Sequence, residues 1–168
     1  MEKSKDKTSS TSKKTETATL AAGCFWHVEE AFREVKGVLS TTVGYIGGNT
    51  INPDYEQVCT SETGHAEAVQ IIFYPAIVSC KKILEIFWSM HDPTQVDRQG
   101  PDFGTQYRSA IFYHSHQQKK EALASKEITQ KKISKPIATQ IVPATSFYKA
   151  EDYHQQYLHK RGLKTCGV

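Results

Sequence analysis

Apolar residues beyond position 17 recur with two different periods, and each period predicts a different kind of element. Between residues 24 and 36 they recur every three or four positions, the spacing of one helix face, and Gly37 is placed to end that helix. Between residues 65 and 74 they alternate every second position, as in a strand with one buried face. The helical stripe consists of Phe25, Val28, Phe32 and Val35.

The rest of the chain continues this alternation of short strands and helices. A loop is expected around "GYIGG", and the polar segment of residues 91–109 is too long for a plain connection. Strands separated by helices and by loops of uneven length predict an α+β protein, a two-layer α/β sandwich with a mixed central sheet covered by helices. Strands are predicted over residues 19–22, 65–74, 107–113 and 137–142, and helices over 24–36, 80–90, 117–132 and 149–160.

A chain of 168 residues with 38% hydrophobic content is large enough for one domain with a substantial core. Residues 1–17 hold one apolar residue, five lysines and three acidic residues, so we expect a disordered polar tail there. Five minus three gives this tail +2 of the net charge of +3, which leaves +1 for the body. We therefore expect a cytoplasmic protein that binds neither nucleic acid nor membranes.

The four cysteines form no close pair and no CxxC motif, so reduced thiols are expected. Cys24 stands where the predicted first helix begins, and unpaired backbone N–H groups at such a position stabilise a thiolate. His27 could add positive charge nearby, which would favour a reactive nucleophile. The alternative is a small buried hydrophobic residue, which is also the simplest interpretation of Cys80.

Two large aromatic residues follow Cys24 directly. Adjacent helical residues point about 100° apart, so Phe25 and Trp26 cannot both face the same core. Phe25 belongs to the apolar stripe of the helix and Trp26 does not. Trp26 could line an apolar pocket for a substrate group beside the thiol, or it could lie against a neighbouring loop.

Glu67 lies on the apolar face of the predicted strand. Burial there would raise the pKa of its carboxyl group, so that it could act as a general acid near neutral pH. The alternative is a glutamate at the end of a strand that reaches water past Gly64. The neighbours on its face are Val69, Ile71 and Phe73.

Polar side chains in the predicted loops add further candidates. Tyr55 precedes the strand of Glu67, and Asp102 and Tyr107 flank a turn with a glycine. A phenol can donate a hydrogen bond to a polar oxygen without carrying charge. Each of these residues taken alone is also typical of a solvated or capping position.

Five stretches, in the order of the family, closely resemble the peptide methionine sulfoxide reductase family, type A. They are "GCFWHVE", "GYIGG", "YEQVCTSETGHAEAV", "HDPTQVDRQGPDFGTQYRS" and "AEDYHQQYL", and the resemblance runs from about residue 18 to residue 158. The resemblance implies a ferredoxin-like sandwich with its catalytic domain over residues 18–160. It also implies that the protein is a thiol-dependent oxidoreductase that reduces methionine S-sulfoxide and so repairs oxidised proteins.

The resemblance assigns a role to each candidate residue. Cys24 would be the nucleophile that attacks the sulfoxide sulfur, and Glu67 the acid that protonates the leaving oxygen. Phe25 and Trp26 would form the pocket for the S-methyl group. Three side chains would bind or polarise the sulfoxide oxygen, and they are Tyr55, Asp102 and Tyr107.

A second thiol is needed because attack leaves Cys24 as a sulfenic acid. By resemblance, Cys166 in a flexible C-terminal segment, residues 161–168, forms a disulfide with it. Cys59 is a rival for this role, or a loop thiol without a redox function. Thioredoxin or dithiothreitol would act as the reductant, with no bound cofactor. The expected partners are thioredoxin and proteins that contain methionine sulfoxide, and a monomer is expected.

Two functions of other classes remain open on the residues alone. A metal-binding module could use His114 and His116, but a metal site needs three or four ligands and no second cluster stands near them in sequence. A cysteine hydrolase could use Cys24 with a histidine base. It would turn over without a reductant, whereas the reductase requires a dithiol.

Overall fold

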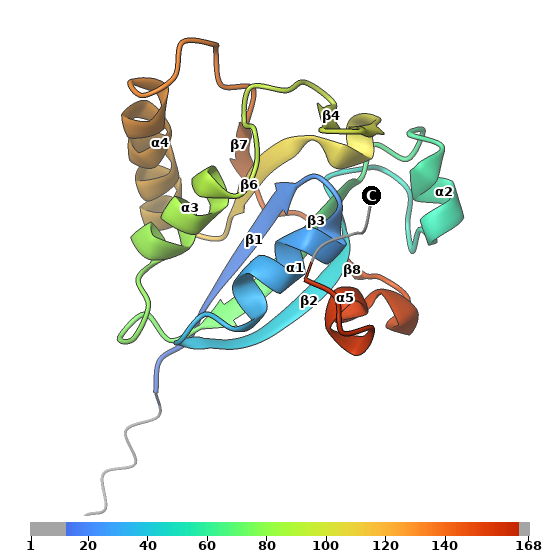
Figure 1. Cartoon of the computed structure of the whole chain (residues 1–168), viewed down its shortest axis with the longest axis horizontal. Helices are drawn as coiled ribbons and strands as arrows, with labels where there is room; N and C mark the ends of the chain where they lie inside the picture. Colours follow the sequence, from blue (N-terminus) through green and yellow to red (C-terminus); the bar gives the residue numbers. More distant parts are fainter. Residues whose placement is uncertain (1–12, 165–168) are drawn as a thin grey trace, which may run out of the picture.

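Six strands form one sheet in the computed structural model, which describes residues 13–164. The strands are β1 (Glu16–Ala22), β2 (Val38–Ile46), β3 (Ala66–Phe73), β6 (Ser109–Tyr113), β7 (Gln140–Pro143) and β8 (Tyr148–Lys149). Their order across the sheet is β7-β6-β1-β3-β2-β8 (Figure 1). The pair β6–β7 is parallel and the other neighbours are antiparallel, so the sheet is mixed, as predicted.

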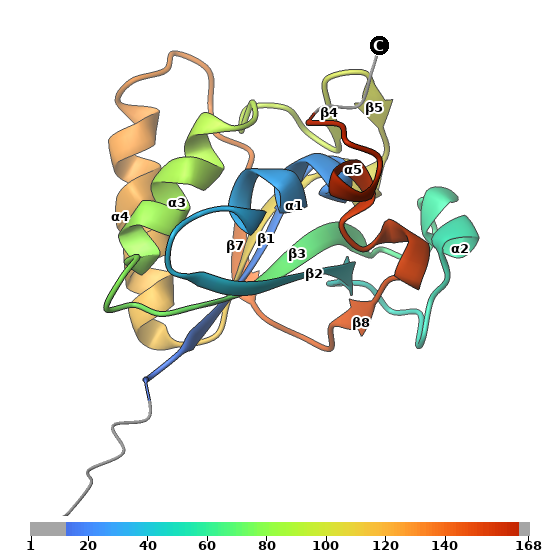
Figure 2. The ribbon, with the colours of Figure 1, turned by 60° about the horizontal axis from the view of Figure 1, so that its bottom comes forward.

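Helices flank this sheet. They are α1 (Phe25–Arg33), α2 (Tyr55–Cys59), α3 (Cys80–Ser89), α4 (His116–Gln130) and α5 (Tyr157–Lys160). Figure 2 shows α1 lying over the central strands, where it contacts β1, β2 and β3, while α3 packs against α4 at the side. No helix in the described part of the chain has the length and apolar character that crossing a membrane requires.

The chain order β1-α1-β2-β3-α3-β6 and the spatial order β6-β1-β3-β2 together give the ferredoxin-like arrangement. The α+β class and the flanked mixed sheet are thus confirmed. Between α3 and β6 the chain adds a small hairpin and a 3-10 turn, and a second such turn precedes α5. These elements are β4 (Arg98–Gln99), β5 (Asp102–Phe103), η1 (Thr105–Tyr107) and η2 (Asp152–His154).

The two faces of the sheet contribute to separate hydrophobic clusters. In β3 the alternation predicted from the sequence holds, because one set of alternate residues packs into the large cluster beneath α1 and α3. The other set packs into a smaller cluster on the opposite face. The β3 residues of the large cluster are Val69, Ile71 and Phe73, and those of the small cluster are Ala66 and Ala68.

The expected loop around "GYIGG" is in part strand β2, which the sequence analysis missed. Strand β2 contains Gly44, a residue type that is uncommon within strands. A Cβ atom at Gly44 would lie 2.4 Å from the carbonyl oxygen of Tyr148 in β8. Glycine is therefore needed because β8 approaches the backbone of β2 closely, a long-range contact that the local pattern does not contain.

The prediction of one helix over residues 149–160 is also wrong, because only part of this range is helical. The chain forms η2 there, turns at Gln155 and Gln156, and becomes helical only in α5. The Gln155 side chain binds the backbone N–H and carbonyl of Val43 in β2, at 2.9 and 3.0 Å. Tertiary hydrogen bonds thus override a helical preference that was read from residue types.

Other boundaries differ in detail. Strand β1 begins at Glu16, so the last two residues of the predicted tail pair with β3, while residues 1–12 lie outside the described part of the chain. Helix α1 ends at Arg33 rather than at residue 36, and β6 begins at Ser109 rather than at residue 107. Cys166 and the second half of the segment of residues 161–168 also lie outside the described residues.

Candidate active site

The chain turns from β1 into α1 at Gly23 and Cys24. Gly23 has a φ of 92°, and a Cβ atom there would lie 2.7 Å from Cβ of Gln99, so only glycine fits. Cys24 is the N-cap of α1, and its carbonyl accepts the backbone N–H groups of His27 and Val28. The half-buried thiol therefore lies at the positive end of the helix dipole, the position that the sequence predicted.

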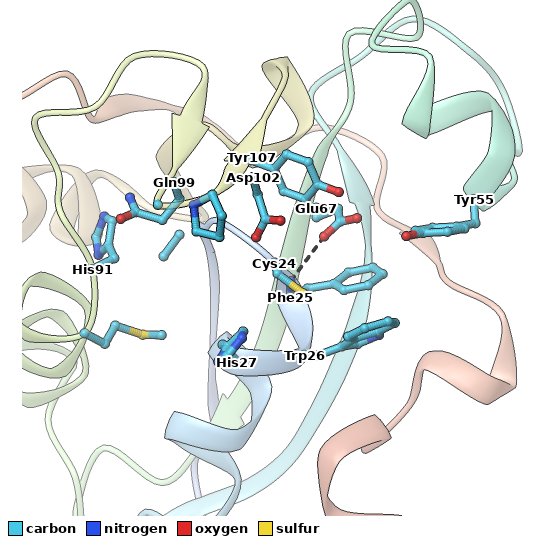
Figure 3. A pocket seen from close by; sticks show the side chains of 14 residues that line it. Cys24, Phe25, Trp26, His27, Tyr55, Glu67, His91, Gln99, Asp102 and Tyr107 are labelled. Atoms are coloured by element: carbon cyan, nitrogen blue, oxygen red, sulfur yellow. Dashed lines mark hydrogen bonds between the residues drawn. The ribbon is translucent and has the colours of Figure 1, made fainter. Parts of the chain in front are cut away.

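Glu67 lies in β3 beside the start of α1 and is 1% exposed, which contradicts the alternative of a solvated strand end. Its Oε2 accepts the backbone N–H of Phe25 at 3.2 Å, the contact drawn in Figure 3. Burial raises the pKa of the Glu67 carboxyl to about 8; the negative charge of Asp102 adds to the rise, and the Phe25 hydrogen bond opposes it. The carboxyl group is therefore protonated at neutral pH.

An aromatic wall continues from the thiol along α1. Phe25 is buried and Trp26 is half-buried, and both line the same cavity as Cys24. The Trp26 indole stacks on the Tyr157 ring of α5, with centroids 3.6 Å apart and planes 4° apart. Its N–H donates to Nδ1 of His154 at 2.9 Å. Trp26 thus lines the cavity and also packs against a neighbouring segment, so both positions considered for it in the sequence analysis hold.

The imidazole of His154 is fully buried behind this wall. Because Nδ1 accepts the Trp26 N–H, the neutral ring carries its hydrogen on Nε2, which lies 3.7 Å from a carboxylate oxygen of Glu151. Burial lowers the pKa of His154, and Glu151 opposes the shift. A neutral His154 is therefore the form that can accept the indole hydrogen.

Polar groups face the thiol from other elements. Figure 3 shows Asp102 of β5, Tyr107 of η1 and Tyr55 of α2 arranged around Cys24 and Glu67. Burial raises the pKa of both the Tyr55 and the Tyr107 hydroxyl groups. Both phenols remain protonated and can donate hydrogen bonds. Tyr55 was predicted in a loop, but it is the first residue of α2.

The site is a single open cavity of about 520 Å³. It brings together all seven candidates of the sequence analysis that lie within the described residues, whereas Cys166 falls outside them. The cavity wall also contains side chains that sequence reasoning did not single out, among them Met90, His91 and Gln99. The seven are Cys24, Phe25, Trp26, Tyr55, Glu67, Asp102 and Tyr107.

Two of the residues that sequence reasoning missed, His154 and Tyr157, stand in the stretch "AEDYHQQYL". That stretch contributed to the resemblance, but none of its residues received a role. His91, also missed, has a pKa lowered to about 4 by burial, and its two nitrogens bond to the carbonyl of Phe87 and the hydroxyl of Ser109. His154 and Tyr157 thus support the cavity from behind, through contacts between distant segments, whereas His91 forms part of its wall.

The other thiols differ in their surroundings. Cys80 is buried in the core, and burial raises its pKa to about 12, consistent with a packing role. Cys59 is exposed at the end of α2, one helical turn after Tyr55, which lines the cavity. Within residues 13–164 no group of three or more His, Cys, Asp or Glu side chains could hold a metal ion. His114 instead bonds to the hydroxyl of Thr19 at 2.8 Å.

A thiol at the N-cap position of α1, a protonated carboxyl group beside it and an apolar wall, all on a ferredoxin-like scaffold, are the groups expected of a thiol enzyme. The family model described as peptide methionine sulfoxide reductase matches residues 16–168. The chain belongs to this family, in its MsrA branch, and its activity is methionine sulfoxide reduction.

Curated relatives and solved structures agree. A peptide methionine sulfoxide reductase MsrA of Methanosarcina mazei is 62% identical over 88% of this chain and 71% of its own length. The peptide methionine sulfoxide reductase MsrA of Geobacter sulfurreducens is 56% identical over 90% of this chain and 94% of its own length. The reduced form of Mxr1 from Saccharomyces cerevisiae is 38% identical, with a TM-score of 0.86 over 91% of this chain and 89% of that one.

Proposed function

We propose that the cavity reduces methionine S-sulfoxide, in proteins and as the free amino acid, by direct attack of Cys24 on the sulfoxide sulfur. The observation that carries this proposal is the carboxyl group of Glu67, buried beside the thiol with a pKa of about 8. Sulfoxide oxygen is a poor leaving group until it is protonated, and a carboxyl group protonated at neutral pH can supply that proton.

In the first step the Cys24 thiolate forms a bond to the sulfoxide sulfur while Glu67 transfers its proton to the oxygen. The hydroxyl group is then transferred to the Cys24 sulfur, which becomes a sulfenic acid, and methionine is released. The cysteine sulfur loses the two electrons that the sulfoxide gains. Oε2 of Glu67 accepts the Phe25 N–H, which leaves the other carboxyl oxygen to hold the transferable proton.

The remaining residues would hold the substrate in place. Phe25 and Trp26 would accept the S-methyl group on the apolar wall, which orients the sulfur toward Cys24. Tyr55 and Tyr107 would donate hydrogen bonds to the oxygen as negative charge develops on it. Asp102 would contribute to binding at this polar side and, through its charge, helps to keep Glu67 protonated.

Recycling would use a disulfide. We assign the resolving role to Cys166, whose thiol would attack the sulfenic acid, release water and form a disulfide with Cys24. Thioredoxin would then reduce this disulfide, an assignment supported by the solved complex of Mxr1 with Trx2, 29% identical with a TM-score of 0.62. Cys59 remains the rival, because it is exposed one helical turn from Tyr55, a residue of the cavity wall.

The test is incubation of the purified protein with each epimer of methionine sulfoxide, free and within a peptide, with dithiothreitol as the reductant. Methionine should form from the S epimer in both substrates, and the Cys24→Ser variant should form none. Equal turnover of the R epimer would contradict the stereochemical part of the proposal. Cleavage of an ester or amide substrate without a dithiol would instead identify a hydrolase.

A further inference from the structure

The segment that follows β8 holds the back of the aromatic wall. It carries His154, which accepts the Trp26 N–H, and Tyr157, which stacks on the indole. The guanidinium group of Arg161 covers the other face of the Tyr157 ring, with its Cζ atom 3.6 Å from the ring centroid. Trp26 is thus the inner layer of a stack whose position depends on where this segment is attached to the rest of the fold.

A sharp corner at Gln156 separates the two supporting residues. Gln156 has φ of 51° and ψ of 40°, a left-handed conformation that costs a residue other than glycine or asparagine about 1 kcal/mol or more. A backbone of this kind persists where the surrounding structure fixes it. The side-chain amide of the preceding Gln155 accepts the backbone N–H of Val43 in β2 and donates to the carbonyl groups of Val43 and Ala150.

Glu29 of α1 fixes the corner itself. It stands one helical turn after Trp26, and only 1% of its surface is exposed. One carboxylate oxygen accepts the backbone N–H of Gln156, and the other accepts the hydroxyl of Thr41 in β2 at 2.7 Å. The helix that carries the thiol and Trp26 is therefore bonded, through one buried side chain, to the corner between His154 and Tyr157.

We propose that Glu29 is a positioning residue for the S-methyl pocket: its carboxylate holds the Gln156 corner, and the corner sets the place of His154 and Tyr157 against Trp26. Glu29 does not line the cavity, so it acts on the substrate only through this wall. The inference rests on the proposed role of Trp26 in substrate binding. If Glu29 were merely part of the core, its loss would lower stability and leave the affinity for sulfoxide unchanged.

The experiment uses a Trp88→Phe background, in which Trp26 is the remaining tryptophan of the two in the chain. Trp88 lies in α3 and does not line the cavity. The variants are Glu29→Ala, which removes both hydrogen bonds, and Glu29→Gln, whose amide oxygen can still accept the Gln156 N–H. Thr41→Val is the matched control, because it removes only the partner of the other carboxylate oxygen.

Glu29→Ala should raise KM for methionine sulfoxide on the order of 10-fold, the range for a lost hydrogen bond to a charged group. The single-turnover rate at saturating substrate should change less than about threefold, since Cys24 and Glu67 are untouched. Acrylamide should quench Trp26 fluorescence more strongly, because the indole loses its fixed support. Glu29→Gln and Thr41→Val should keep KM and quenching close to those of the parent.

An unchanged KM and unchanged quenching in a folded Glu29→Ala protein would overturn the proposal. If that variant does not fold, Glu29→Asp serves instead, because its carboxylate is shorter by one methylene; parental KM and quenching there would also overturn it. Trp26→Ala tests substrate binding by Trp26 separately from the support of its indole by Glu29. If its KM stays parental, Trp26 does not bind substrate and that assignment fails, whereas the quenching arm still reports whether Glu29 supports the indole.

Discussion

Replacement of Glu67 by glutamine tests the acid assigned to the reaction. The amide has nearly the same shape, and its oxygen can still accept the Phe25 N–H that Glu67 accepts at 3.2 Å. The substitution therefore removes the transferable proton and leaves the local hydrogen bond and the aromatic wall in place. Any effect on the chemical step can then be attributed to proton transfer rather than to a rearranged cavity.

The magnitude follows from the burial of this carboxyl group. With a pKa of about 8 it is protonated in roughly nine molecules of ten at pH 7, whereas at its ordinary value of 4.5 roughly three in a thousand would be. Burial thus raises the fraction of competent acid roughly 300-fold. Loss of a general acid slows a reaction by about 10²- to 10⁴-fold, and we expect Glu67→Gln to fall in this range.

The assay is single-turnover release of methionine from the S-sulfoxide, measured between pH 6 and 10 with Glu62→Gln, an exposed glutamate, as the control. The parent rate should decline about tenfold per pH unit above pH 8 as Glu67 loses its proton. Glu67→Gln should be slow throughout and should lack this decline. A parental rate, or the same alkaline decline in the variant, would refute the role of Glu67 as the acid.

Three further outcomes are expected. Cys24→Ser should abolish methionine release while circular dichroism stays parental, since a hydroxyl group is a far poorer nucleophile; turnover near the parent rate would remove Cys24 from the mechanism. Cys166→Ser should release one methionine per enzyme in a single turnover, and it should lose more of its turnover with thioredoxin than with dithiothreitol. If this variant keeps full turnover with thioredoxin, and mass spectrometry finds a Cys24–Cys59 disulfide, the resolving role belongs to Cys59. As the pH rises from 5 to 8, the free energy of unfolding should fall further in the parent than in Glu67→Gln, by on the order of 4 kcal/mol. The reason is that native Glu67 keeps its proton at pH values where the unfolded carboxyl has lost it. Equal pH dependence of the two proteins in urea titrations would mean that the carboxyl is not desolvated.

The core of the site could be predicted because its signals are local. Glu67 belongs to a run of alternating residues, so the period of a strand alone places it among Val69, Ile71 and Phe73. Cys24 stands at the change from strand to helix periodicity, which marks a helix N-terminus without any knowledge of tertiary contacts. Local periodicity therefore locates both groups to which we assign the reaction.

The supporting parts could not be predicted in the same way. Strand β2 contains Gly44 because β8 lies against it, and the corner at Gln156 exists because of bonds to Glu29 and Val43. His154 accepts the N–H of Trp26, a residue 128 positions away in the sequence. Each of these features depends on a contact between segments that are distant in the chain, and one sequence carries no local pattern for such a contact.

The peptide N–H of Phe25 connects Cys24 and Glu67, the two groups to which we assign the reaction. It belongs to the first residue after Cys24, and it donates to Glu67, whose cross-strand partner in β2 is Tyr45. The centroid of the Phe25 ring lies 5.8 Å from that of the Tyr45 ring, so the register between β2 and β3 helps to fix Glu67 relative to Cys24. The same N–H restrains the rise in the pKa of Glu67 that burial causes. Because an acid with a much higher pKa would give up its proton reluctantly, this one hydrogen bond would, in the proposed reaction, both place the proton and keep it transferable near neutral pH.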